Sequence, residues 1–341
     1  MIAVVKEKVG KGWQLRQIPK PTMAGNEVLL EVKKIGICGS DMAIYDGREK
    51  ELALPVVPGH EFGGEIIDCG LGVSDLVVGN RVVVNLVKNC GRCNYCRRGD
   101  VNLCLDTDLI GFHTNGGFAK YAAVPARNCH LIPDSMSWEA AAAVDPVTSA
   151  LAALKKTGIQ SSDTVCILGP GPIGLYGCQI AKAEGAKNVI MLGTRKARLA
   201  LAAKLGADHT LLVQHENPMA VIEDVQKITQ SKGADVVLEA SGNPDTLDLA
   251  LQLAAKGGRV ALVSIYHKSS QVDPMTIVFN ELKVFGSFDY KWTDFEEAIQ
   301  MIASGRVLTT PLITHTFPLK EIQAGIKAME DKQAIKVMID P

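Results

Sequence analysis

The chain is expected to fold as an α/β protein with two domains, one built on a doubly wound parallel sheet and the other rich in β-strands. Three observations predict this fold class. The 341 residues exceed the usual size of a single domain. Strand and helix patterns alternate through the second half of the chain, which is typical of parallel β–α–β units. A glycine-rich turn joins the first of these strands to a helix.

The first 147 residues read as mostly strand. Segments rich in Val and Ile, bounded by Gly, Asn or Pro, occupy 27–37, 63–70 and 80–87. Many short strands and turns predict a barrel-like domain. The final residues, 289–341, return to a mixed pattern, and we expect them to complete this first domain. The boundaries expected are therefore 1–147 with 289–341 for the β-rich domain, and 148–288 for the parallel-sheet domain.

The elements of the second domain follow in regular order. A helix pattern begins at residue 138 and ends at Gly158. A buried strand is expected at 164–169, a short strand near 209–213, and further strands at 188–193, 234–241, 257–265 and 281–288. Helices are expected at 172–185, 195–206 and 218–231. In the tail, a helix is expected at 293–304 and a last strand at 335–340.

Composition excludes several classes of function. The net charge of −1 gives no basic surplus that would favour nucleic acid or an anionic membrane as partner. No stretch approaches the roughly 20 apolar residues of a membrane span, and the opening residues read as a strand rather than a signal peptide. Nine cysteines without a secretory signal indicate reduced thiols and a cytoplasmic protein.

Four of the cysteines lie within fifteen residues, with the spacing C-x2-C-x2-C-x7-C. They are Cys90, Cys93, Cys96 and Cys104. Thiolates this close can converge on one tetrahedral ion, and a four-thiolate set is typical of structural zinc. Disulfides and an iron–sulfur cluster are the alternatives. With four sulfur ligands no position remains for a substrate, so we expect this zinc to take no part in catalysis.

A G-x-G-x-x-G sequence spans residues 169–174, where it follows a buried strand and opens a helix. Gly169 permits the tight turn, Gly171 lets the backbone approach a pyrophosphate, and Gly174 allows close packing of helix on strand. Together with Pro172 and Ile173, they form the first helical turn that offers N–H groups to phosphates. This context predicts a dinucleotide site rather than a glycine-rich turn without a ligand.

The end of the next strand predicts which nicotinamide cofactor is preferred. An acidic residue there would bind the ribose 2′-hydroxyl of NAD and repel a 2′-phosphate. The chain instead has Gly193, Thr194 and Arg195. Gly193 leaves space, Thr194 can donate a hydrogen bond, and the Arg195 guanidinium can pair with a phosphate. We therefore expect NADP to be preferred, with use of NAD as the alternative.

A second, reactive zinc site is indicated upstream of the four cysteines. His60 and Glu61 lie on a glycine-flanked turn, and Cys38 precedes them in the segment 36–41. Thiolate, imidazole and carboxylate are good zinc ligands, and a set with fewer than four firm ligands leaves a position open. An open zinc lowers the pKa of a bound alcohol, which favours hydride transfer. Taken singly, each residue could be ordinary packing; their coincidence favours a catalytic site.

The chain resembles the zinc-dependent medium-chain dehydrogenases, which include alcohol, sorbitol, threonine and 2,3-butanediol dehydrogenases. The resemblance covers essentially the full length. It rests on motifs that occur in the family's order: GICGSD (36–41), GHEFGG (59–64), the four-cysteine lobe, GGFAKY (116–121) and GPGPIG (169–174). It implies a GroES-like catalytic domain and a Rossmann domain, an active site in the cleft between them, two zinc ions per chain, and a homodimer or homotetramer that forms through the edge of the Rossmann sheet.

The resemblance also implies roles for single residues. Cys38 and His60 match firm ligands of the catalytic zinc, and Glu61 matches a carboxylate that ligates directly or through water. Asp145 stands where sorbitol-type enzymes carry a Glu, and its shorter side chain predicts intermittent or water-mediated ligation. Two further residues match supporting groups: Ser40 passes the substrate proton outward, and Asp41 orients the zinc-bound imidazole.

Three positions depart from the family. Ala43 replaces a proton-relaying His, so we expect the proton to leave through water. Gly193 replaces the acidic residue that selects NAD, in a run similar to that of NADP-dependent bacterial secondary alcohol dehydrogenases. Asp289 and Tyr290 stand where sorbitol dehydrogenases carry Arg-Tyr, and an acidic Asp289 disfavours anionic substrates.

The expected function is reversible oxidation of a secondary alcohol, a polyol or diol, to a ketone, with hydride passed to NADP or NAD. Asp289 favours a second possibility, an amino-alcohol or threonine dehydrogenase. A non-catalytic NADP-binding protein on the same fold is a third, and a zinc-free quinone reductase a fourth. The presence of Cys38 and His60 disfavours both of these.

Overall fold

The computed structural model of the chain describes residues 1–213 and 218–341. The chain divides into two compact units. The first contains Met1–Asp145, Lys291–Ala303 and Thr309–Pro341, and the second contains Pro146–Tyr290 and Ser304–Leu308. The predicted α/β class, with a parallel sheet and a separate β-rich unit, is confirmed.

The first unit is built on a seven-stranded sheet. Its strand order is β16-β17-β3-β4-β5-β9, with β8 also paired to β3. The bounds are β3 Glu27–Ile37, β4 Glu61–Cys69, β5 Arg81–Val84, β8 Tyr121–Pro125, β9 Cys129–Leu131, β16 Ile313–Pro318 and β17 Lys336–Asp340. Two small sheets accompany it: β1 (Ile2–Val5) with β2 (Gln14–Gln17), and β6 (Val87–Lys88) with β7 (Asp108–Leu109).

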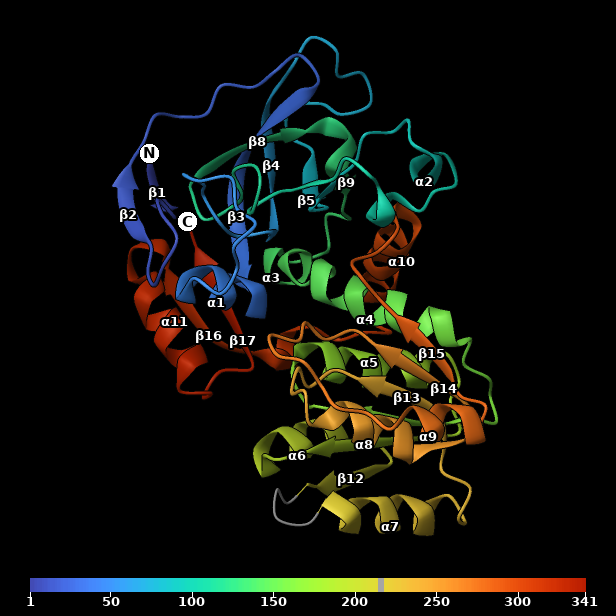
Figure 1. Cartoon of the computed structure of the whole chain (residues 1–341). Coiled ribbons are helices and arrows are strands. Elements are labelled where there is room, and N and C mark those ends of the chain that lie inside the picture. Colours follow the sequence, from blue (N-terminus) through green and yellow to red (C-terminus); the bar gives the residue numbers. More distant parts are fainter. Residues whose placement is uncertain (214–217) are drawn as a thin grey trace. The chain divides into compact units, whose positions relative to one another are not determined.

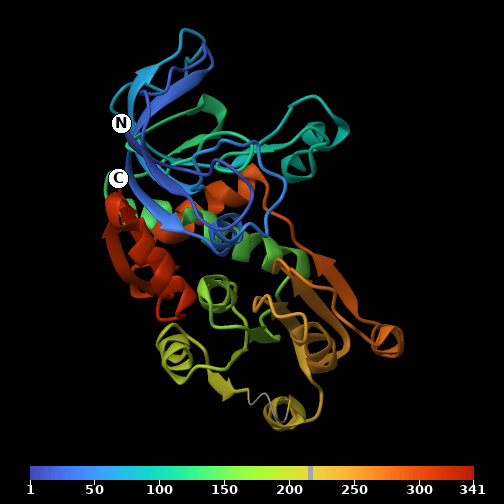
Figure 2. The same ribbon diagram turned by 60° about the vertical axis from the view of Figure 1, so that its left-hand side comes forward.

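The tail of the chain belongs to this sheet. Strand β17 pairs antiparallel with β3, with Val337 opposite Ile37, and Figures 1 and 2 show the red C-terminal segment beside the blue N-terminal strands. The helices of this unit are α1 (Gly39–Asp46), α2 (Asn94–Arg97), α3 (Trp138–Ala142), α10 (Trp292–Ala303) and α11 (Ile322–Glu330). Gly325 of α11 packs closely against the sheet. A Cβ added at this position would lie 3.0 Å from the Ile37 side chain and 3.2 Å from that of Val337.

The second unit contains a six-stranded parallel sheet with the order β12-β11-β10-β13-β14-β15. Its strands are β10 Thr164–Leu168, β11 Asn188–Gly193, β12 His209–Leu212, β13 Ala234–Glu239, β14 Ala254–Leu262 and β15 Lys283–Gly286. Its helices are α5 Pro172–Ala183, α6 Lys196–Lys204, α7 Pro218–Ile228, α8 Thr246–Leu253 and α9 Pro274–Phe279. The chain enters the unit within helix α4 (Val144–Thr157).

Both faces of the parallel sheet are covered. Because side chains alternate along a strand, neighbours on β10 face opposite sides. Cys166 packs in an apolar cluster with Val225 of α7 and Leu249 of α8. Ile167 instead lies near Gly177 of α5, where an added Cβ would be 3.9 Å from its side chain. This double burial explains why β10 reads as a continuous apolar run in the sequence.

The single helix expected from residue 138 is interrupted. Helix α3 ends at Ala142, Ala143 is a turn residue, and α4 begins at Val144. Ser137 caps α3, because its hydroxyl accepts a hydrogen bond from the N–H of Ala140 at 3.1 Å. A run of four alanines favours helix, but Pro146 in the first turn of α4 has no N–H to donate to the carbonyl of Ala142, so one helix cannot continue through this point.

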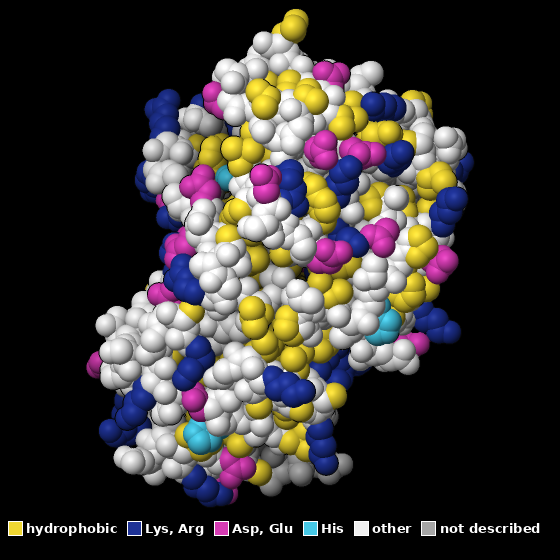
Figure 3. All heavy atoms as spheres, turned by 180° about the vertical axis from the view of Figure 1, so that it is seen from behind, with side chains coloured by type: hydrophobic (Ala, Val, Ile, Leu, Met, Phe, Trp, Pro, Cys, Tyr) yellow, Lys and Arg dark blue, Asp and Glu magenta, His cyan; other side chains and the backbone are white. Residues whose placement is uncertain are grey.

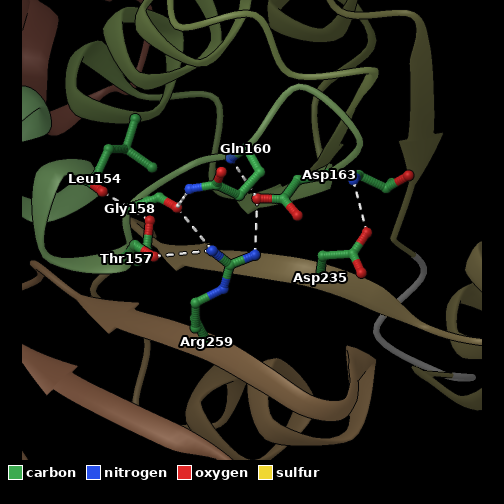
Figure 4. Close-up of polar contacts among 8 residues, drawn as sticks. Leu154, Thr157, Gly158, Gln160, Asp163, Asp235 and Arg259 are labelled. Carbon is green, nitrogen blue, oxygen red and sulfur yellow. Dashed lines mark hydrogen bonds and ion pairs between the residues drawn. The ribbon is translucent and has the colours of Figure 1, made fainter.

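Figure 4 shows how Arg259 of β14 joins the amino ends of the strands to the end of α4. Its guanidinium donates to the carbonyls of Thr157 (3.0 Å) and Gly158 (2.8 Å) and to the Asp163 carboxylate (2.7 Å). The same Asp163 oxygen accepts from the N–H of Gln160. Carbonyls at a helix end need such donors, so Arg259 satisfies them while pairing a buried acid.

Among the helices of the described residues, none is long and apolar enough to cross a membrane. On the face drawn in Figure 3, Lys and Arg side chains are interspersed with Asp and Glu.

Candidate metal centres and cofactor site

The four cysteines of the lobe converge. The Sγ atoms of Cys90, Cys93, Cys96 and Cys104 all lie within 4.8 Å of one another. The two pairs Cys93–Cys96 and Cys90–Cys96 are 3.5 and 3.9 Å apart, close to the roughly 3.8 Å between sulfurs on one tetrahedral zinc with 2.3 Å bonds. All nine cysteines of the chain are described, and none forms a disulfide.

Hydrogen bonds to sulfur prepare this lobe for thiolates. The N–H groups of Cys90 and Asp106 donate to Cys104 at 3.2 and 3.3 Å, and the Asn89 amide donates to Cys96 at 3.4 Å. The N–H of Cys96, with other bonds to the sulfur, lowers the pKa of Cys93 to about 6, whereas burial raises the pKa of Cys96 to about 11. Donors aimed at sulfur favour its ionised form, which is the form that binds zinc. The residues fit a zinc ion.

A second group of three possible ligands comprises Cys38, His60 and Glu61, whose ligand atoms also lie within 4.8 Å of one another. The fold of the sheet brings them together. In the antiparallel pair β3–β4, Gly36 near the end of β3 lies opposite Glu61 at the start of β4. Cys38 follows β3 directly and precedes α1, so it comes to lie beside His60 across the pair. The donor set and its burial fit zinc.

Two neighbours of this group come from the first turn of α1. The Ser40 hydroxyl lies 3.5 Å from His60 Nε2. Asp41 is fully buried, and its Oδ2 accepts the N–H of Cys38 at 2.9 Å. Its Oδ1 lies 3.8 Å from His60 Nδ1, which is beyond hydrogen-bond length. Burial alone would lower the pKa of His60, but Asp41 and Cys38 outweigh it and raise that pKa well above its usual value.

Sequence reasoning missed Lys336. This residue opens β17, is 1% exposed, and forms an ion pair with Glu61 Oε2. Its ammonium also donates to the carbonyl of Ile37 at 3.1 Å. Burial lowers its pKa, yet the Glu61 carboxylate outweighs this effect, and the pKa is raised. A lysine inside the apolar segment IKVMID was the one signal available, because an unpaired lysine is almost never fully buried.

Asp145 is buried, and its charge raises the pKa of both His60 and Lys336. Its carboxylate is not among the ligand atoms that gather within 4.8 Å of one another in the described residues. Ala43, at the position of the relaying histidine, is buried in α1. Asp289 has a left-handed backbone, with φ of 41°.

The glycine-rich turn is shaped by contacts that exclude side chains. Gly169 has φ of 99°, and a Cβ there would approach Ser241 Cα to 2.7 Å. A Cβ on Gly174 would lie 2.0 Å from the carbonyl oxygen of Gly169. Gly171, the N-cap of α5, has open space where its Cβ would be, followed by Pro172 and Ile173 in the first helical turn. This turn leaves the helix N–H groups accessible to a phosphate.

Gly193 has a packing role that the sequence did not reveal. A Cβ at this position would lie 2.4 Å from Cγ of Pro170. The ring of Pro170 in the turn therefore requires a residue without a side chain at the end of β11. An acidic side chain cannot occupy position 193 while Pro170 keeps its place.

Two arginines lie just beyond this point. Arg195 is the half-buried N-cap of α6, and Arg198 follows one turn later, also half-buried. Burial and the charge of Arg195 lower the pKa of Arg198 to about 10. An anion between them would relieve their repulsion. The sequence indicated Arg195 and missed Arg198; the i, i+3 spacing on a helix was the signal that would have revealed it.

Comparisons with known proteins agree with this description. The family model for the alcohol dehydrogenase GroES-like domain matches residues 24–134, and that for the zinc-binding dehydrogenase matches residues 172–304. Sorbitol dehydrogenase of Halalkalibacterium halodurans is 35% identical to this chain, and the matched region spans 100% of this chain and 99% of the relative. L-threonine 3-dehydrogenase of Alteromonas mediterranea is also 35% identical, with the same coverage.

Solved structures give the same result. A zinc-binding dehydrogenase of Sinorhizobium meliloti 1021 bound to NADP superposes with a TM-score of 0.93 at 31% identity, covering 100% of this chain and 99% of that chain. An alcohol dehydrogenase of Escherichia coli CFT073 complexed with NADH has a TM-score of 0.92 at 32% identity and the same coverage. The chain belongs to the zinc-dependent medium-chain dehydrogenase family.

Proposed function

We propose that the protein reversibly oxidises a secondary alcohol, a polyol or diol, to a ketone, with NADP as its preferred hydride acceptor. The gathering of Cys38, His60 and Glu61 beside a supporting Ser40 is the observation that carries this proposal. A relative named sorbitol dehydrogenase, similar over its whole length, supports the polyol class.

Two zinc ions would be held, one by Cys38 and His60 with Glu61 or Asp145, the other by the four cysteines of the lobe. The catalytic zinc supplies a Lewis acid that lowers the pKa of the substrate hydroxyl. The geometry supports a contribution of Ser40 through its half-buried hydroxyl, 3.5 Å from His60 Nε2, which can accept the substrate proton and pass it to water. Ala43 has no group that could carry the proton further, so Ser40 Oγ is the point at which it leaves.

The buried charges around Glu61 support a defined role for Lys336. The ammonium neutralises a carboxylate that is 1% exposed, and so makes an ionised Glu61 tolerable at this depth. Asp41 holds the N–H of Cys38, which fixes the backbone from which the thiolate extends.

For the cofactor, we propose that Thr194, Arg195 and Arg198 bind the 2′-phosphate of NADP. The test compares kcat/KM for NADP and NAD in the wild type, Arg195→Ala and Lys196→Ala. Loss of one charge-assisted bond is expected to raise KM for NADP by about 10- to 100-fold and leave KM for NAD within about threefold. Lys196 is exposed next to Arg195, so its variant controls for loss of one positive charge. Equal effects on both cofactors would refute a phosphate role.

Oxidation of L-threonine is the second candidate. It is favoured by Asp289, whose carboxylate would attract an ammonium group, and by the similarity to L-threonine 3-dehydrogenase. Parallel assays of sorbitol, 2,3-butanediol and L-threonine, following NADPH and NADH formation, decide between the two candidates. Turnover of L-threonine alone would overturn the polyol proposal.

We also propose a homodimer or tetramer in the cytoplasm. Strand β15 is an edge of the parallel sheet, and several large apolar side chains near it are exposed: Val278, Phe279, Val284 and Phe288. An apolar open edge is a natural pairing surface for a second copy. The molar mass by light scattering, for the wild type and for Val284→Lys, tests this assembly. The free thiols of both metal sites favour a reducing compartment.

A further inference from the structure

Glu239 is a buried acid that belongs to neither group of metal ligands and not to the phosphate-binding turn. It is the last residue of β13 and is fully buried. Its Oε1 accepts hydrogen bonds from the Ser241 N–H (2.9 Å), the Ser241 hydroxyl (2.5 Å) and the Thr246 hydroxyl (2.9 Å). Its Oε2 accepts from the Tyr266 hydroxyl at 2.5 Å.

Among the described residues, no cation pairs with this carboxylate. Within residues 1–213 and 218–341, no Lys, Arg or His forms an ion pair with Glu239. Burying a carboxylate without a cation is costly, even when hydrogen bonds satisfy its oxygens. A neutral side chain would fill the position at lower cost, so stability alone does not explain an acid here.

The carboxylate ties together two loops that follow neighbouring strands. Ser241 belongs to the loop after β13 and Thr246 is the first residue of α8, where that loop ends, whereas Tyr266 belongs to the segment after β14. Two further bonds join these neighbouring segments: the Val263 N–H donates to the carbonyl of Glu239 at the end of β13 (3.2 Å), and the Gly242 N–H of the loop donates to the Ser264 hydroxyl (2.9 Å).

The first of these loops touches the phosphate-binding turn. The N–H of Ala240 donates to the carbonyl of Leu168 at 2.9 Å. The backbone of Ser241 lies so close to Gly169 that any side chain on Gly169 would collide with it. The position of the loop that Glu239 holds therefore bears directly on the turn that binds the pyrophosphate.

The sheet order indicates which part of the cofactor lies there. The order β12-β11-β10-β13-β14-β15 reverses between β10 and β13, and a dinucleotide binds across such a switch point, outside the carboxyl ends of the strands. The first half of the sheet, with β11 and Arg195, takes the adenine nucleotide. The second half, with β13 and β14 (Figure 1), takes the nicotinamide nucleotide.

We propose that Glu239, acting through Ser241, Thr246 and Tyr266, is a positioning residue for the nicotinamide half of the cofactor. Its role is exerted through these three side chains. It holds the loops after β13 and β14 in one arrangement, so that the cofactor meets a preformed surface and does not have to order these loops when it binds.

The test separates the two halves of the cofactor. The dissociation constant of NADPH is measured by fluorescence, and that of adenosine 2′-monophosphate, an adenine-half probe without the 5′-phosphate, by calorimetry. The variants are Glu239→Gln, Tyr266→Phe and, as a matched control, Glu184→Gln, which alters an exposed acid in the same unit. The choice of probe rests on the proposed NADP preference. NADH is therefore titrated into the wild type as well, with adenosine as the probe if NADH binds more tightly, so a wrong cofactor choice is recognised separately.

We expect Glu239→Gln to weaken NADPH binding about tenfold, equivalent to about 1.4 kcal/mol, while the adenine-half probe and the control change less than twofold. Tyr266→Phe should act in the same direction, because it removes one of the four bonds to the carboxylate. Unchanged NADPH binding in both variants overturns the proposal. Equal weakening of both probes also overturns it, since that result indicates general loss of structure. If Glu239→Gln does not fold, Tyr266→Phe decides alone.

Discussion

Replacing Arg259 with Met should destabilise the parallel-sheet unit strongly. The arginine side chain is 18% exposed and its partner Asp163 only 7%. The variant removes three charge-assisted hydrogen bonds and leaves two carbonyls at the end of α4 without this donor. Asp163 keeps only the N–H of Gln160 among the donors to its Oδ2. Breaking a buried pair costs about 3–5 kcal/mol, and the apolar packing of Met recovers part of this, so we expect a loss of about 3 kcal/mol.

The change is measurable as a shift in melting temperature. For a unit of this size, each kcal/mol corresponds to about 2–4 °C, so Arg259→Met should melt about 6–12 °C lower by circular dichroism. Lys256→Met is the matched control, because Lys256 is an exposed cation on the same strand. Arg259→Lys should fall between the two, since an ammonium keeps the charge without the planar fork. A loss below 2 °C for Arg259→Met would show that water replaces these bonds at no cost and would refute the reasoning.

Two further outcomes are expected from the site and from the β-rich unit. Cys38→Ser should abolish turnover, reduce bound zinc from about two ions to about one per chain, and leave NADPH binding within about twofold; unchanged turnover would remove Cys38 from the catalytic site. Burial lowers the pKa of His130 to about 4, from 6.5 in the unfolded chain; Glu296, 3.8 Å away, is two-thirds exposed, so water weakens its pull on the proton. Between pH 6.5 and 4 the unfolded chain binds the extra proton, so stability falls as pH falls through this window, by about 2 kcal/mol at pH 5. His130→Leu should remove that part of the pH dependence seen in urea unfolding, whereas His209→Asn, at an exposed histidine, should keep it.

The features that the sequence predicted well are local. The glycine turn, the buried strand before it and the helix after it lie within 164–183 and specify one another. The four-cysteine spacing is equally local, because short loops force the sulfurs together. The residues of such a motif are close in the sequence, so their arrangement can be predicted without knowledge of the rest of the fold.

The features that were missed depend on residues distant in the chain. Glu61 and Lys336 meet only because β17 pairs with β3, and β3 with β4. Neither strand pairing follows from periodicity. Pro170 likewise excludes a side chain at position 193 only because β10 and β11 pair. From the sequence, Gly193 was expected to leave space for a phosphate. The structure shows that Pro170 also requires a glycine at this position.

The pairing of β17 with β3 has a consequence for how the protein is made. The parallel-sheet unit is nearly continuous in the chain, from Pro146 to Tyr290, so it can fold while synthesis proceeds. The β-rich unit cannot, because its sheet lacks two strands until the ribosome has released the tail. Until then Glu61 has no ammonium beside it. We therefore expect the parallel-sheet unit to acquire its structure first and the unit with the two groups of metal ligands to be completed last.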